Sequence, residues 1–165
     1  ALSQEACRKI IDFQVMCDSF NIPIVRFMDT PGFGVGTVAE LKGAPGWIMN
    51  FMNSSCLVTV PSITVIVRKA YGRAYVAMGG GRHNDEMIAW PTAEVSFMDP
   101  NFATSIVHGV DIGEEGFEDA LADIQKDSAV WDMATIFSSY SLFSGFGSRL
   151  FLICSPLTIM LTCPP

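Results

Sequence analysis

Charged residues are scarce in this chain of 165 residues, where they make up 16% of the sequence and hydrophobic residues make up 50%. An average soluble domain carries charge at about a quarter of its positions. One domain of this length can bury a substantial core by itself. The shortage of charge therefore predicts either that a partner covers much of the surface or that the chain belongs to something larger.

Basic residues and long apolar runs are also lacking. The net charge is −7 and the isoelectric point is near 4.6, which argues against a nucleic-acid partner and against a basic membrane-binding face. The best candidate for a spanning segment, residues 150–163, contains Pro156 and is shorter than the roughly 20 residues that a membrane helix needs. Residues 1–5 lack the basic start of a signal peptide. We expect no membrane association and a cytoplasmic location.

Paired cysteines and metal-ligand clusters are absent from the sequence pattern. The 5 cysteines contain no C-x-x-C spacing, and neither His83 nor His108 lies near a cysteine in a ligand-type pattern. This usage favours reduced, buried thiols and predicts no metal site. The cysteines are Cys7, Cys17, Cys56, Cys154 and Cys163.

Alternating helix and strand patterns predict a layered α/β fold with crossover connections. Ser3 is a candidate N-cap for a helix that ends near residue 20. The apolar runs 22–28 and 62–67 predict strands buried on both faces. The other expected elements are a helix over 38–52 interrupted at Gly43 and at Pro45–Gly46, a short helix ending at Met78, strands at 88–90 and 94–98, and helices over 100–108 and 114–126.

The glycine-rich loop Asp29–Gly36 follows the first strand, at a position where open α/β sheets bind ligands. Its segment Gly34–Ala39 fits the dinucleotide form G-x-G-x-x-A, but the acidic residue expected near position 59 is missing. Its Asp-Thr-Pro-Gly is similar to a GTPase D-x-x-G, yet no lysine lies in a phosphate-binding loop. The polar run His83–Glu86 is interpreted as a solvated turn, with an acid–base or metal site as the alternative.

Small residues at two strand ends, without a patterned nucleophile or base, suit chemistry in which backbone N–H groups stabilise an oxyanion. Enolate chemistry on thioesters has this requirement. Motifs in the same order then resemble the carboxyltransferase (beta) subunits of biotin-dependent acyl-CoA carboxylases, transcarboxylases and decarboxylases. The resemblance covers residues 6–110, and its motifs are Cys17–Pro23, Asp29–Phe33, Gly36–Thr37, Val67–Gly72, Ala74–Tyr75 and Ala89–Glu94.

The resemblance implies a crotonase-like fold of ββα superhelical units, of which this chain represents part of the second, biotin-facing domain. We expect that domain to occupy residues 1–138. Residues 139–165 form a low-charge tail that is atypical of the family and is interpreted either as covered by a partner or as non-native sequence. The implied location is cytoplasmic, or the mitochondrial matrix in a eukaryote.

The resemblance also implies the reaction, a carboxyl transfer from carboxybiotin to the α-carbon of an acyl-CoA such as propionyl-CoA. In the family, carbon dioxide is released from carboxybiotin, the biotin takes the α-proton of the thioester, and the enolate attacks the carbon dioxide. Backbone N–H groups stabilise both oxyanions. The implied cofactor is biotin on a carrier protein or domain, and the implied partners are that carrier, a biotin carboxylase subunit, acyl-CoA and further copies of the chain in a hexamer.

Carried over residue by residue, the resemblance places the biotin-facing oxyanion hole at the backbone N–H groups of Arg73 and Ala74. Arg73 stands where the family has glycine, which would remove the hole if that position needed a glycine-only φ. Val76 stands where propionyl-type members often carry Asp, so it points to a different acyl group. The residues implied to line the biotin channel are Thr30, Pro31, Gly32, Phe33, Gly34, Gly36, Gly72, Pro91 and Thr92.

Two other functions remain open on the residues. The chain could be a non-catalytic structural or truncated component of a carboxylase or decarboxylase assembly, as its low charge suggests. It could also bind a dinucleotide through Gly34–Ala39, a reading that the missing acidic residue weakens.

Overall fold

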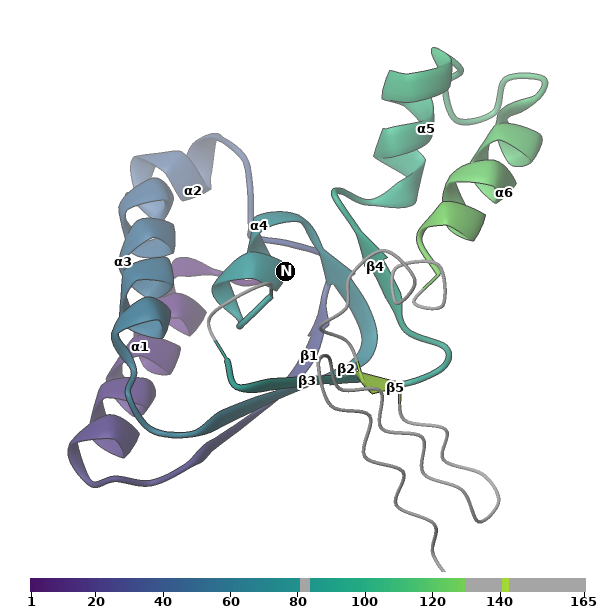
Figure 1. Ribbon diagram of the computed structural model, residues 1–165. Helices are drawn as coiled ribbons and strands as arrows, with labels where there is room; N and C mark the ends of the chain where they lie inside the picture. Colours follow the sequence, from purple (N-terminus) through teal and green to yellow (C-terminus); the bar gives the residue numbers. More distant parts are fainter. Residues whose placement is uncertain (81–83, 130–140, 143–165) are drawn as a thin grey trace, which may run out of the picture.

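A parallel sheet forms the centre of the chain (Figure 1). The computed structural model describes residues 1–80, 84–129 and 141–142. Within them, the strand order is β1-β2-β3-β5, and β4 also pairs with β2. The strands are β1 (Ile24–Thr30), β2 (Ser62–Tyr71), β3 (Glu86–Ala89), β4 (Glu94–Ser96) and β5 (Ser141–Leu142).

Helices cover the sheet on one side and extend beyond it on the other. Figure 1 shows α1 and α3 side by side against the sheet, while α5 and α6 form a helical pair that projects away from it. The alternation of strands and helices confirms the predicted layered α/β class. The helices are α1 (Gln4–Ser19), α2 (Thr37–Leu41), α3 (Ala44–Leu57), α4 (Gly72–Ala77), α5 (Pro100–His108) and α6 (Phe117–Asp127).

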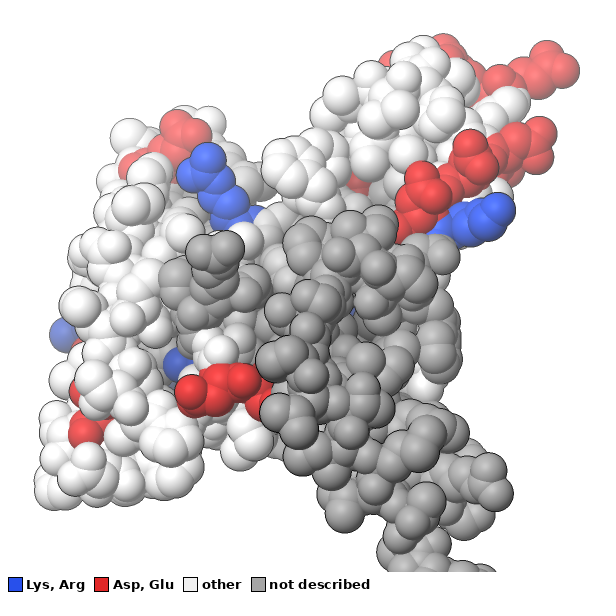
Figure 2. Space-filling model, viewed as in Figure 1, with Lys and Arg blue, Asp and Glu red and all other residues white. Residues whose placement is uncertain are grey.

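Local capping signals set the helix boundaries. The Ser3 hydroxyl accepts a hydrogen bond from the Ala6 N–H at 3.3 Å and starts α1, as predicted. The left-handed Gly43 divides the helix expected over 38–52 into α2 and α3. The acidic helix begins at Phe117, later than the predicted residue 114, because the left-handed Gly116 forms its N-cap. Acidic side chains gather over this helix in Figure 2.

The expectation that both long strands are buried on both faces is wrong. Burial alternates along β1, where Ile24, Arg26 and Met28 are buried while Val25 and Phe27 are 57% and 70% exposed. In β2, Ile63 and Val67 are likewise exposed. Within the described residues, the helices cover one face of the sheet, and apolar side chains on the other face are exposed.

A buried polar group joins β1 to two helices. Gln14 of α1 accepts hydrogen bonds from Arg26 Nε at 3.2 Å and Nη2 at 2.9 Å, and its own amide donates to Ser54 Oγ at 3.1 Å. Ser55 donates to the Ala77 carbonyl oxygen at 2.8 Å and thereby adds α4 to the group. Burial lowers the pKa of the Arg26 guanidinium, because a charged group loses hydration there.

The cysteine expectation holds in part. Cys7 and Cys17 are buried thiols, as predicted, and burial raises the pKa of Cys7. Cys56 lies at the surface, so the prediction that it is buried is wrong. Cys154 and Cys163 lie outside the described residues. The described helices include none long and apolar enough to cross a membrane, and the described His, Cys, Asp and Glu residues form no cluster of metal-ligand type.

We predict that Gly79→Ala lowers the free energy of unfolding by roughly 1–3 kcal/mol. Gly79 has φ +106°, and a Cβ there would lie 2.7 Å from Thr64 Oγ1, which donates to the Met78 carbonyl oxygen at 3.0 Å. The matched control is Gly46→Ala in α3, where the added Cβ meets no atom within 4 Å. Urea denaturation followed by circular dichroism measures both variants. Equal effects of the two substitutions would contradict the prediction.

Candidate functional site

The candidate site lies where β1 and β2 end, and the pairing of the two strands is irregular there. Met28 pairs with Ile66, and the next partners are Thr30 and Ala70, so β2 contributes extra residues between the two pairs. Such a bulge bends a strand and redirects its side chains. The irregular segment of β2 contains Arg68 and Lys69.

Asp29 holds this irregular segment in place. Its carboxylate accepts hydrogen bonds from Arg68 Nε and from the backbone N–H of Lys69, both at 3.2 Å, and Arg68 Nη2 lies 3.1 Å from its second oxygen. The hydrogen bond from Arg68, together with that from Lys69, lowers the pKa of Asp29. The last residues of both strands are thereby fixed relative to each other.

The loop after β1 is closed by its own hydrogen bonds and by the start of the chain. Thr30 Oγ1 bonds with both the N–H and the carbonyl oxygen of Gly32. Leu2 donates to the Gly32 carbonyl oxygen at 2.9 Å and accepts from the Gly34 N–H at 2.8 Å. The Phe33 ring packs edge-on against Phe51, with 6.5 Å between the ring centroids. These contacts therefore fix the conformation of the loop from Thr30 to Gly34.

The connection between β3 and β4 reaches the same end of the sheet. Both strands pair with β2, β3 along Ile63–Ile66 and β4 along Lys69–Tyr71, so the intervening Trp90–Ala93 turn lies opposite the irregular segment. Pro91 and Thr92 form the tip of this turn, which the hydrogen bond from the Ala93 N–H to the Trp90 carbonyl oxygen closes at 2.9 Å.

The buried Tyr71 secures β4 against the end of β2. Its hydroxyl donates a hydrogen bond to a Glu94 carboxylate oxygen, and Lys69 Nζ lies 5.8 Å from the centre of its ring. Burial and the Glu94 carboxylate raise the pKa of Tyr71. The phenol therefore stays protonated and serves as a structural donor.

Helix α4 begins directly after Tyr71 and contains the predicted oxyanion residues. Gly72 takes the positive φ of +61°, and a Cβ on it would lie 3.2 Å from the Phe97 carbonyl oxygen. Arg73 has no such φ, because Asn21 is the one non-glycine residue with positive φ among those described. Its side chain is exposed, whereas Ala74 is fully buried. The departure from the family glycine is therefore compatible with the backbone conformation.

The first turn of α4 can supply hydrogen-bond donors. N–H groups in the first turn of a helix have no carbonyl partner within the helix, and this applies to Arg73 and Ala74. Val76 lies one turn further and is partly buried. Leu2, Phe33 and Ala77 belong to one apolar cluster, which brings the loop after β1 close to α4.

The other predicted candidates have different places. Asp85 accepts a hydrogen bond from the Ser62 N–H at 2.7 Å and so joins the starts of β2 and β3, which supports its interpretation as part of a turn. His83 lies outside the described residues, and His108 ends α5. Gly36 forms the N-cap of α2, which is only 5 residues long. A helix this short differs from the long helix that holds the pyrophosphate in dinucleotide-binding folds.

Sequence reasoning missed the pairs that shape the site. Asp29 with Arg68 and Tyr71 with Glu94 all belong to motifs that drew attention, but each pair joins residues far apart in the chain. Opposite charges at the ends of two neighbouring parallel strands were the available signal for the first pair. No signal within a single segment indicates the second pair.

The carboxyl transferase domain family matches residues 1–132. The chain therefore belongs to this family. Among curated relatives, the propionyl-CoA carboxylase beta chain of Roseobacter denitrificans is 41% identical over 68% of this chain and 22% of its own length. The methylmalonyl-CoA decarboxylase subunit alpha of Veillonella parvula is 43% identical over 64% of this chain and 21% of its own length. The chain thus spans about a fifth of the length of these relatives.

A solved structure of transcarboxylase 12S, a hexamer with methylmalonyl-CoA bound, is similar to this chain. The TM-score is 0.75 at 32% identity, and the likeness covers 82% of this chain and 27% of that one. The parallel α/β sheet and this likeness confirm the crotonase-like fold expected from the sequence motifs.

We predict that Asp29→Asn lowers the free energy of unfolding by up to about 1 kcal/mol at neutral pH, the range of solvent-exposed ion pairs. Because the folded state lowers the pKa of Asp29, its contribution is present above the unfolded pKa of about 4 and is lost as the pH falls through the folded value. In urea denaturation, the difference in unfolding free energy between the parent and Asp29→Asn should be smaller at pH 3 than at pH 7. The control is Asp12→Asn, which removes the carboxylate of the exposed ion pair with Arg8. If the loss of unfolding free energy in Asp29→Asn grew towards pH 3, the stabilising role given to the Asp29 carboxylate would be refuted.

Proposed function

We propose that this chain forms the biotin-facing half of an acyl-CoA carboxyltransferase, which transfers a carboxyl group from carboxybiotin to the α-carbon of an acyl-CoA. The observation that carries the proposal is the family match over residues 1–132, together with the meeting of its separate motifs at one end of the sheet. The loop after β1, the end of β2 and the β3–β4 turn all contribute to that end.

Open space and unused backbone donors support the binding of a biotin ring at this end of the sheet. Open space lies beside Gly32, since a Cβ at that residue would meet no atom within 4 Å, and the tip residues Pro31 and Thr92 are exposed. The first turn of α4 supplies N–H donors for a carbonyl oxygen. In this proposal Thr30–Phe33, Gly34 and Gly36 form one wall, Pro91 and Thr92 support the opposite side, and Gly72 allows α4 to start close to the ring.

Bound carboxybiotin supplies the carboxyl group that is transferred. The backbone N–H groups of Arg73 and Ala74 donate to the ligand oxygen that becomes negatively charged, which is where preorganised donors lower a barrier most. The exposed Arg73 side chain adds positive charge beside that oxygen without occupying the backbone position. Val76 would influence the choice of acyl group from the following turn of the helix.

The proposed partners are those of a multi-subunit carboxylase. They are a biotin carboxyl carrier protein or domain, a biotin carboxylase subunit and further copies of the chain in a hexamer. The names of the relatives support this set, since transcarboxylase 12S is described as a hexamer assembly and the propionyl-CoA carboxylase proteins as beta chains. The exposed apolar face of the sheet supports association of some kind.

A non-catalytic role in such an assembly is the second candidate. The observation that favours it is the extent of exposed apolar surface, which includes Val25, Phe27, Phe97 and Phe102. A monomeric domain rarely exposes such a surface. In this case the chain would bind the biotinylated carrier without transferring a carboxyl group.

We predict that Arg73→Pro lowers the rate of carboxyl transfer about 100-fold or more, because it removes one oxyanion donor. Proline is tolerated in the first turn of a helix, where no internal hydrogen bond is lost. The matched control is Arg73→Ala, which keeps the N–H and removes the charge. The assay supplies the acyl-CoA-binding half of the enzyme from a relative, mixes it and the chain with methylmalonyl-CoA and biotin, and measures carboxybiotin by mass spectrometry.

Binding is measured alongside activity. Calorimetric titration with a biotinylated carrier domain should show binding by the parent chain and by Arg73→Ala. Binding without any carboxyl transfer by the parent would favour the non-catalytic role, and absence of both would refute both candidates. Equal transfer rates in Arg73→Pro and Arg73→Ala would show that the Arg73 N–H does not act as an oxyanion donor.

A further inference from the structure

Helix α4, whose first turn carries the N–H groups of Arg73 and Ala74, is too short to hold its own orientation. It has 6 residues. A helix of this size is about 9 Å long, and isolated helices shorter than roughly 12 residues are marginal in water. The direction in which the two N–H groups point therefore depends on the neighbours that hold the helix.

Two buried hydroxyl groups hold the carboxyl end of α4. Ser55 Oγ donates to the Ala77 carbonyl oxygen at 2.8 Å, and Thr64 Oγ1 donates to the Met78 carbonyl oxygen at 3.0 Å. Carbonyl groups in the last turn of a helix have no partner within the helix, so these side chains supply one. Ser55 is 2% exposed and Thr64 is fully buried, so bulk water does not compete for either bond.

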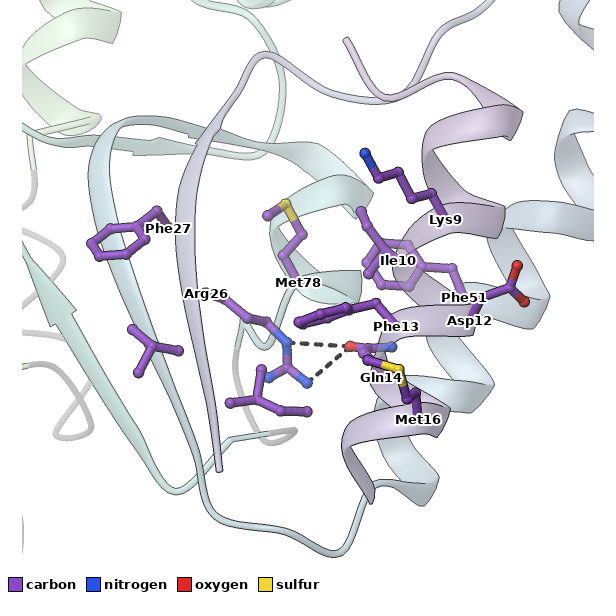
Figure 3. Close-up of a pocket in the computed structure, with 12 residues that line it drawn as sticks. Lys9, Ile10, Asp12, Phe13, Gln14, Met16, Arg26, Phe27, Phe51 and Met78 are labelled. Carbon is purple, nitrogen blue, oxygen red and sulfur yellow. Dashed lines mark hydrogen bonds between the residues drawn. The ribbon is translucent and has the colours of Figure 1, made fainter. Parts of the chain in front are cut away.

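Both hydroxyl groups belong to elements that are themselves fixed. Thr64 lies in the middle of the sheet, where it pairs with Arg26 of β1 and with Met87 of β3. Ser55 lies on α3, and its hydroxyl is also 3.3 Å from Gln14 Oε1. Figure 3 shows that Arg26 donates to the same Gln14 oxygen, which ties α1 to the sheet beside α3. The carboxyl end of α4 is therefore attached to the sheet directly through Thr64 and indirectly through Ser55.

The backbone that leaves α4 packs closely around the same end. Gly79 has φ +106°, and a Cβ on it would lie 2.7 Å from Thr64 Oγ1. A Cβ on Gly80 would lie 2.6 Å from the Tyr75 carbonyl oxygen, within the helix itself. The chain after α4 thus has no slack, and a displacement at either hydroxyl group is passed to the whole helix.

The amino end of α4 leaves its N–H groups available. The side chain of the N-cap residue Tyr71 makes no capping hydrogen bond, and its hydroxyl donates instead to Glu94. Gly72 brings the helix start close to the Phe97 carbonyl oxygen, 3.2 Å from the position of a Cβ. One end of α4 is therefore fastened by side-chain donors, while the other presents backbone donors.

We infer that Ser55 and Thr64 are positioning residues for carboxyl transfer, because their hydroxyl groups set the orientation of α4 and so aim the N–H groups of Arg73 and Ala74. Both residues act at the end of the helix opposite to the ligand. A misplacement of about 1 Å in an oriented group can lower a rate about 100-fold. The effect on transfer rests on the proposed function, whereas the effect on the orientation of α4 does not.

Four variants test this inference. Thr64→Val keeps the shape of the side chain and removes the hydroxyl, and Thr64→Ser keeps the hydroxyl. Ser55→Ala removes the second donor. The matched control is Thr104→Val in α5, since Thr104 is also fully buried and donates to the Pro100 carbonyl oxygen at 2.8 Å.

Amide NMR spectra of the nitrogen-labelled chain report the position of α4. We expect Thr64→Val and Ser55→Ala to shift the amide signals of Arg73 and Ala74. Because these amides lie at the far end of the helix, about 9 Å away, their signals report movement of the helix and not the substitution itself. Thr64→Ser and Thr104→Val should leave both signals at their parental positions.

The transfer assay described above, with the acyl-CoA-binding half supplied by a relative, measures the consequence. At equal concentrations of folded protein, kcat should fall about tenfold in Thr64→Val and in Ser55→Ala, while the KM for methylmalonyl-CoA stays within about twofold. Thr64→Ser should keep most of the parental kcat. Thr104→Val should lose stability in urea denaturation and keep the parental kcat.

Several results would overturn the inference. They are parental amide signals of Arg73 and Ala74 in both Thr64→Val and Ser55→Ala, shifted signals with an unchanged kcat, and an equal loss of kcat in Thr64→Ser or in Thr104→Val. A parent chain without transfer activity would refute the proposed function, and the amide signals would then decide by themselves whether the two hydroxyl groups orient α4.

Discussion

Strand β2 is the constraint on which the rest of the structure depends, because it pairs with β1 on one side and with both β3 and β4 on the other. Pairing two successive strands along one edge requires β2 to be long and to change direction between them. The irregularity after Ile66 supplies that change, and the Asp29 carboxylate stabilises it from the neighbouring strand. The loop, the turn and helix α4 take their positions from this arrangement.

Features determined within a few residues were predictable from the sequence. The N-cap Ser3, the helix beginning at Pro100 and the break at Gly43 were all identified, because capping and backbone preference act locally. The motif segments of the candidate site were identified as well. Their meeting at one end of the sheet followed from the resemblance and from the position of strand ends in α/β folds.

Features that depend on distant contacts were not predictable. The apolar side chains of β1 gave no indication that Val25 and Phe27 lie outside the core, since composition alone does not show which face receives the helices. The partners of Asp29 and Tyr71 come from other strands. The backbone at Arg73 was also uncertain from sequence, because the positive φ belongs to its neighbour Gly72.

Gly72 has a consequence for how members of this family could diverge. A Cβ there would press against the Phe97 carbonyl oxygen, and the backbone conformation itself disfavours any other residue. In the proposed site, this position therefore has no room for a new side chain, and a change of substrate preference would act through its neighbours, such as the exposed Arg73 and the partly buried Val76. On the proposed function, a directed-evolution library for altered acyl-group preference would randomise positions 73 and 76 and keep position 72 as glycine.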